Sequence, residues 1–138
     1  MLSEPCREAL AIASVAGREF SVAVVSAASA APPERVLETL GEALAARVIA
    51  EVPQGVGDYR FSHSLVRETL EGELPTAQRV LLHRRVGDAL AAIHGAQPEL
   101  HAAEIAHHYV QAAPGGAAAQ AVEWSLRAAD RATAQLAY

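Results

Sequence analysis

The order of apolar and polar residues predicts a helical chain interrupted once by a short β-hairpin. Apolar positions at helical spacing predict helices over residues 2–17, 21–29 and 32–48. The runs RVIAEVP and YRFS, separated by QGVGD with its two glycines, instead predict two short strands and a turn. Three helices followed by a hairpin is the order of a winged helix. Residues 1–74 are therefore predicted to form a winged-helix domain with a two-stranded β-wing.

The second half of the chain shows helical periodicity throughout. A helix from Ser64 to Leu74 stops at Pro75, and three further helices are predicted over 76–95, 98–114 and 117–138. Residues 75–138 should form an antiparallel, tetratricopeptide-like helical array, and the fold class is mainly α. Since no stop signal precedes Tyr138, we expect the array to continue beyond it. The residues expected in buried stripes are Val36, Leu37, Leu40, Leu44 and Val48, then Leu82, Val86, Leu90 and Ile93, and finally Val122, Leu126, Ala129, Thr133 and Leu136.

Composition indicates a globular domain without a membrane span or a disulfide. Hydrophobic residues make up 51% of the chain, which is enough to bury a core. No run of about 18 apolar residues predicts a membrane span, and no secretory signal precedes the first helix. The single cysteine, Cys6, cannot form an internal disulfide, so we expect a buried structural thiol and a cytoplasmic location.

The charged residues exclude several kinds of chemistry. The net charge is −5 and all 11 basic residues are arginine, so the chain has no lysine for a Walker A phosphate loop or a Schiff base. The third helix would be the recognition helix of a DNA-binding winged helix, but its charges sum to −1. We therefore expect no direct DNA binding. The charged residues in that sum are Glu34, Arg35, Glu38, Glu42 and Arg47.

The stretch YRFSHSLVRETL changes from strand to helix periodicity at His63. Tyr59 and Phe61 alternate with polar residues, whereas Val66 and Leu70 follow helical spacing. A side chain at a helix N-terminus lies beside free N–H groups and the positive end of the helix dipole, where an anion is favoured. His63 is thus either a phosphate contact or a residue that touches only its own helix.

These motifs resemble a region of one known family. The strings LSEPCREALAIASVAGREF, YRFSHSLVRETL, LLHRRVGDAL and HAAEIAHHYVQAA are similar to a region of large bacterial ATP-binding regulators of the LuxR type. Related adenylate-cyclase fusions contain it too, and all are signal-transduction NTPases with numerous domains. In that family the region follows a P-loop ATPase and comprises a winged helix and the start of a tetratricopeptide-like array. The resemblance covers essentially the whole chain.

The resemblance implies a role for His63. In the wider superfamily the corresponding histidine contacts the β-phosphate of bound ADP and helps to hold a closed state. This chain departs from the usual motif at Ser62, where methionine is common, and at Ser64, where aspartate is common. The positions that match the motif are Phe61, His63, Leu65, Val66 and Arg67.

The resemblance also implies a function in transcription regulation and signal transduction. We expect a non-catalytic regulatory part of an ATP-binding protein, coupling the nucleotide state of an adjacent ATPase domain to downstream helical repeats. ADP and ATP would bind the parent protein, and this chain itself would need no cofactor. The alternatives are a stand-alone winged-helix DNA-binding regulator and a scaffold that docks a protein partner.

Two further groups of polar residues are candidate sites. Arg79, His83, Arg84 and Arg85 form a basic cluster that is either a solvated helix face or a docking surface for an acidic partner. His101, Glu104 and His108 share one predicted helix face, but ligands spread over two turns of a straight helix rarely converge on one ion. Glu104 and His107 form a single Glu-x-x-His, whereas a di-iron site needs two. We therefore expect no metal site.

Overall fold

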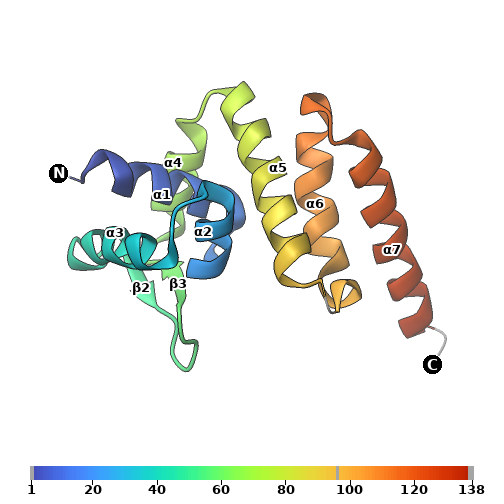
Figure 1. The fold of residues 1–138 in the computed structure, drawn as a ribbon, viewed down its shortest axis with the longest axis horizontal. Coiled ribbons are helices and arrows are strands. Elements are labelled where there is room, and N and C mark those ends of the chain that lie inside the picture. Colours follow the sequence, from blue (N-terminus) through green and yellow to red (C-terminus); the bar gives the residue numbers. More distant parts are fainter. Residues whose placement is uncertain (1, 96, 137–138) are drawn as a thin grey trace. The chain divides into compact units, whose positions relative to one another are not determined.

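The computed structural model describes residues 2–95 and 97–136, and these are mainly helical with a small three-stranded antiparallel sheet (Figure 1). Contacts divide the chain into two compact units, unit 1 up to Arg79 and unit 2 from Val80 onward. The division falls inside helix α5, which spans Thr76–Ile93. Each unit is described below by itself.

Two helices of unit 1 begin at a serine whose side chain caps them. The Ser3 hydroxyl accepts a hydrogen bond from the Cys6 N–H at 3.3 Å, and Ser21 accepts one from the Val24 N–H at 3.1 Å. Both serines therefore satisfy N–H groups that a helix start leaves without an intrahelical partner. The helices of unit 1 are α1 (Glu4–Ala16), α2 (Val22–Ser29), α3 (Pro33–Ala45) and α4 (Ser64–Gly72).

The sheet of unit 1 has one strand more than the predicted two-stranded wing. Strands β2 (Ile49–Glu51) and β3 (Asp58–Phe61) form the expected hairpin, and β1 (Glu19–Ser21) pairs with the other edge of β3. The sequence predicts only a link between the helices over residues 2–17 and 21–29, and that prediction is wrong because β1 lies there. Three residues are too few to show strand periodicity, so β1 is recognised only by its pairing with β3.

The inward face of the sheet supplies aromatic residues to the core of unit 1. Tyr59 and Phe61 alternate with exposed positions along β3, and both are buried. The ring of Phe20, from β1, lies 5.3 Å from Phe61 and 6.1 Å from Tyr59 between centroids. Leu10 of α1 and Leu40 of α3 are also fully buried. The alternation predicted for YRFS thus places its two aromatic rings as expected.

Unit 2 consists of antiparallel helices. Figure 1 shows α6 returning beside α5 in the opposite direction. Contacts of His83 with His108 and of Asp88 with Tyr109 join the two helices. Gly87 lies where a β-carbon would come within 3.1 Å of the Tyr109 ring, which shows how closely the helices approach. After α5 the elements are η1 (Pro98–His101), α6 (Ala102–Ala112), η2 (Ala113–Gly115) and α7 (Ala118–Leu136).

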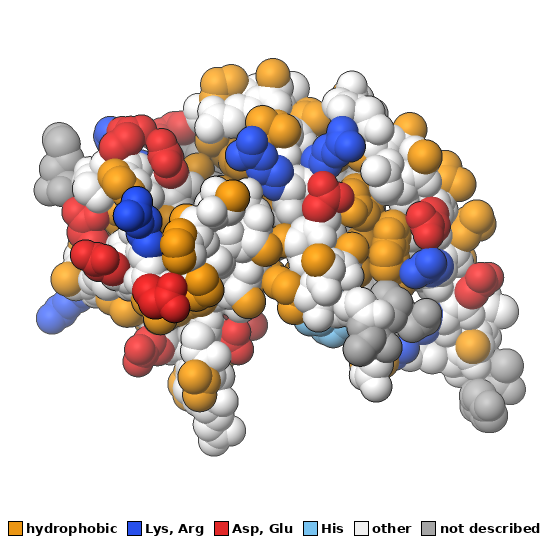
Figure 2. Space-filling view, in the orientation of Figure 1, with side chains coloured by type: hydrophobic (Ala, Val, Ile, Leu, Met, Phe, Trp, Pro, Cys, Tyr) orange, Lys and Arg blue, Asp and Glu red, His pale blue; other side chains and the backbone are white. Residues whose placement is uncertain are grey.

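The buried stripe predicted for the last helix is wrong. Val122 and Leu126 are each 61% exposed, and the buried residues of α7 are Ala121 and Trp124. Hydrophobic side chains accordingly reach the surface over α7 (Figure 2). Trp124 and the small Ala121 pack inward, whereas the aliphatic stripe faces outward. The other members of that stripe, Ala129, Thr133 and Leu136, are exposed as well, as are Leu37 of α3 and Ile93 of α5 from the other two stripes.

Candidate functional site

The β3–α4 junction places His63 at the start of a helix. Phe61 ends the strand, and the Ser62 N–H still donates to the Val48 carbonyl at 3.0 Å. His63 is the N-cap residue of α4 with extended backbone angles, and its side chain makes no capping hydrogen bond. Its carbonyl accepts from the Val66 N–H at 3.1 Å, which begins the helix. The predicted change from strand to helix at His63 is therefore confirmed.

The side chains at the head of α4 face solvent. His63 and Ser64 are exposed, and Leu65 is 69% exposed. An imidazole here can donate a hydrogen bond to an anion that also lies on the first N–H groups of the helix. This geometry is compatible with a phosphate contact by His63, which stays a prediction.

Arg67 fastens α4 to the body of unit 1. Its Nε donates to the carbonyl of Ser14 in α1 at 2.9 Å, across 53 residues of sequence. Its Nη2 lies 3.6 Å from a carboxylate oxygen of Glu71 one turn further along α4. Arg67 therefore holds in place the helix that begins at His63. The sequence did not predict this structural role for Arg67.

The basic cluster Arg79, His83, Arg84 and Arg85 is not one uniform surface. His83 is only 5% exposed, whereas Arg85 is exposed and Arg84 is half-buried. The Arg79 Nη2 donates to the Leu74 carbonyl at 3.3 Å, while its buried Nε has no hydrogen-bond partner within the described residues. Docking of a partner on the arginines stays a prediction. The His83 side chain is buried and does not belong to that surface.

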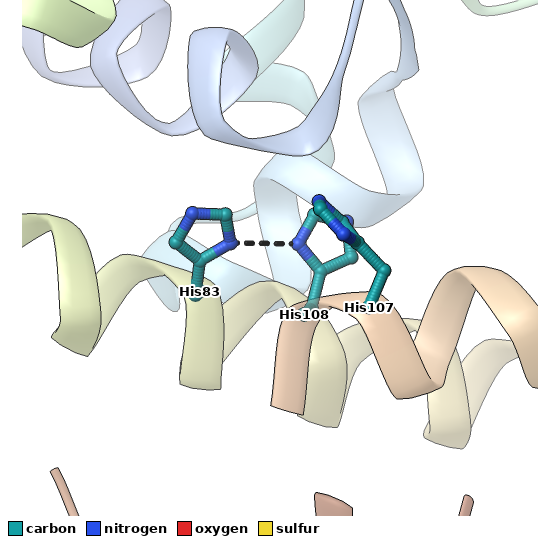
Figure 3. A group of neighbouring side chains, drawn as sticks. All are labelled: His83, His107 and His108. Atoms are coloured by element: carbon teal, nitrogen blue, oxygen red, sulfur yellow. Dashed lines mark hydrogen bonds between the residues drawn. The ribbon is translucent and has the colours of Figure 1, made fainter. Parts of the chain in front are cut away.

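His83 belongs to a cluster of three imidazoles that joins α5 to α6 (Figure 3). Its Nδ1 lies 2.9 Å from the Nδ1 of His108, so one ring donates and the other accepts. Both residues are buried, and the exposed His107 lies beside them, with its ring centroid 5.9 Å from His83 and 5.1 Å from His108. One nitrogen from each ring lies within 4.8 Å of the other two.

The histidines weighed together from the sequence do not converge. His101 lies in η1 at the N-cap of α6, Glu104 is exposed and His108 is buried. His101 instead stacks on His94, with ring centroids 3.5 Å apart. Burial, and then the charge of His101, lower the pKa of His94. The pairing of His83 with His108 was missed because it depends on the register of two helices; the adjacent histidines of AHHY were its only local signal.

Cys6 is buried, as predicted, and lies beside the contact between α1 and α3. Burial first, and then the hydrogen bond to Glu42 and its charge, raise the pKa of the Cys6 thiol from 9.0 to about 11. The neutral thiol is a poor nucleophile at neutral pH. Cys6 is therefore a packing residue in this structure.

Comparisons with protein-family models, with curated proteins and with solved structures find no match to this chain. Within the described residues, no helix is long and apolar enough to cross a membrane. Function is therefore inferred from the geometry of the β3–α4 junction and of the helical array.

Proposed function

We propose that this chain is a non-catalytic regulatory module of a larger ATP-binding signalling protein, and that unit 1 is its winged helix. The observation that supports this best is the head of α4. His63 is exposed there, its side chain makes no capping hydrogen bond, and it begins a helix that Arg67 ties to α1. A phosphate-sensing side chain needs the same combination of an accessible imidazole and a rigid support.

In this proposal His63 contacts the β-phosphate of ADP held by an adjacent ATPase domain. A hydrogen bond to a charged group contributes about 1.5–3 kcal/mol, or roughly 10- to 150-fold in affinity. That is enough to bias two positions of unit 1 relative to the ATPase, but not to bind ADP alone. Because Arg67 ties α4 to α1, a displacement at His63 moves unit 1 as a rigid body and passes to the helical repeats.

The test uses the intact protein with its ATPase domain. His63→Ala should weaken ADP binding by roughly 10- to 150-fold and raise basal output, since the ADP-bound closed state loses a contact. Isothermal titration with ADP measures the first effect. Glu68→Ala is the matched control, because Glu68 is another exposed residue of α4. Equal ADP affinity and equal basal output in wild type and His63→Ala would show that His63 is no phosphate sensor.

A second candidate function, protein docking, is favoured by the apolar stripe of α7. Val122 and Leu126 are each 61% exposed and Leu136 is 86% exposed. In a helical array, the exposed apolar face of one helix is buried by the next helix. We propose that further helices of the same protein cover this stripe.

Leu126→Glu tests this docking role. In the 138-residue chain it should change the free energy of unfolding by less than about 0.5 kcal/mol, because the site is exposed. In a longer chain with the following helices it should cost about 2 kcal/mol or more, the value of burying a leucine. Gln135→Glu adds the same charge at another exposed position of α7 and should be neutral in both. Equal effects of Leu126→Glu on the two chains would exclude docking of those helices on the stripe.

A further inference from the structure

We propose that His83, His107 and His108 form a binding site for a divalent transition-metal ion of the zinc class. The three residues come from two helices, α5 and α6, and one nitrogen of each lies within 4.8 Å of the others (Figure 3). The site is independent of the nucleotide-sensing role proposed for His63.

The spacing of the nitrogens is close to that of a bound ion. In a tetrahedral zinc site with Zn–N bonds of 2.0–2.1 Å, two ligand nitrogens lie about 3.3 Å apart. The Nδ1 atoms of His83 and His108 are 2.9 Å apart, so an ion between them needs the rings to separate by about 0.4 Å. The metal would replace the proton that these two nitrogens now share.

His107 supplies the third ligand. Because His107 is exposed, its ring can turn about its side-chain bonds without repacking a core. The separation of up to 4.8 Å in the cluster must shrink by about 1.5 Å, which is within the reach of a side-chain rotation. The rings of His107 and His108 already lie 5.1 Å apart at 67° to each other, so their nitrogens approach from different directions.

The donor set selects the kind of ion. Neutral imidazoles suit zinc, copper, nickel and iron, whereas magnesium and calcium prefer oxygen ligands. Three protein ligands leave the fourth tetrahedral position for water or an external ligand, as in zinc sites that keep one open position. An ion held this way would tie α5 to α6 beside the close contact of Gly87 with Tyr109.

The experiment titrates the untagged 138-residue chain, freed of metal by a chelator, with Zn²⁺ and with Co²⁺. We expect one equivalent of each to bind, with the visible absorption of Co²⁺ in a site of low coordination number. Zn²⁺ at 100 times its Kd should raise the Tm by roughly 5 °C or more, because an ion that binds only the folded chain stabilises it. Mg²⁺ should do neither.

Two variants assign the site. His107→Ala should bind both ions at least about tenfold more weakly, since even residues that only orient a metal ligand contribute about 10- to 100-fold. It should keep the wild-type helical content, because His107 is exposed. His63→Ala, an exposed histidine in unit 1, should bind like wild type.

Three results would overturn the site: wild type binds no Zn²⁺ at submillimolar concentration, His107→Ala binds as tightly as wild type, or His94→Ala loses the ion while His107→Ala keeps it. The last result would move the ion to the stacked pair of His94 and His101. His108→Gln, checked for folding by circular dichroism, gives a second reading and should also lose Co²⁺ absorption.

Discussion

Ser3 joins two helices that are far apart in the sequence. Besides capping α1, its hydroxyl donates to Glu42 Oε2 at 2.7 Å and its backbone N–H donates to Glu42 Oε1 at 2.9 Å. These two bonds, the side-chain bond first, lower the pKa of Glu42 below its ordinary value of 4.5. One carboxylate therefore makes the contact between α1 and α3 sensitive to acid.

The pH dependence of stability should reveal this contact. Because the pKa of Glu42 is lower in the folded chain, the unfolded chain takes up the proton first on acidification. The stabilisation is complete above pH 4.5 and is lost as the pH falls through the folded pKa. In urea titrations from pH 7 downward, Glu42→Gln should therefore lose less stability than wild type below pH 4.5. Glu38→Gln, an exposed position on the same helix, should follow wild type; parallel curves for Glu42→Gln would refute the contact.

At the scale of elements, α5 and α6 depend on one glycine for their close approach. A β-carbon at Gly87 would meet three atoms of the Tyr109 ring at 3.1–3.2 Å. That ring is buried, and its hydroxyl donates to Asp88 at 2.6 Å, so it has little freedom to move away. Burial and this hydrogen bond also raise the pKa of Tyr109, which keeps the hydroxyl protonated as a donor.

Gly87→Ala should therefore destabilise the chain by about 1–3 kcal/mol, the usual cost of overpacking. Helix propensity alone predicts the opposite sign, a gain of about 1 kcal/mol. Gly41→Ala in α3 is the matched control, since nothing lies within 4 Å of its added β-carbon, and it should show that gain. Chemical denaturation of both variants measures the difference. A stabilised Gly87→Ala would mean that the helices lie further apart than described.

At the scale of the whole molecule, the net charge bears on whether the chain could bind DNA. The chain has 16 acidic residues against 11 arginines, which gives a net charge of −5. Affinity for DNA depends on neutralising several phosphates with basic side chains, and that affinity falls steeply with salt. The net charge of this chain opposes such binding.

We expect no measurable binding to duplex DNA at micromolar protein, at either about 50 mM or about 200 mM salt. Between these concentrations the affinity of a DNA-binding protein with several phosphate contacts falls by roughly 10³- to 10⁵-fold. Fluorescence anisotropy with a labelled duplex is the measurement. The double variant Glu34→Arg, Glu38→Arg reverses two exposed charges on α3 and should gain weak, salt-sensitive affinity if α3 is the recognition helix of a winged helix. Salt-sensitive micromolar binding by wild type would favour a DNA-binding regulator instead.

Much of the fold is determined by local sequence. The serine caps at residues 3 and 21, the glycine-rich turn between β2 and β3, and the strand-to-helix change at His63 all depend on neighbours within a few residues. Such interactions involve only residues close in sequence, so the positions of the helices and of the hairpin can be predicted from the sequence alone. The burial of Cys6, Tyr59 and Phe61 follows in the same way, from apolar character and period.

What only the tertiary structure decided depends on contacts between distant residues. Strand β1 is defined by pairing with β3, and the inward face of α7 by the fit of Trp124 rather than of Leu126. The backbone of Arg47 is left-handed, at φ 61°, although helix ends of this kind usually have a glycine. Two hydrogen bonds at the end of α3 hold Arg47 in this conformation, so no local residue predicts it. The pairing of His83 with His108 across 25 residues exists because α5 and α6 pack in one register, and register is a property of packed helices that neither segment contains by itself.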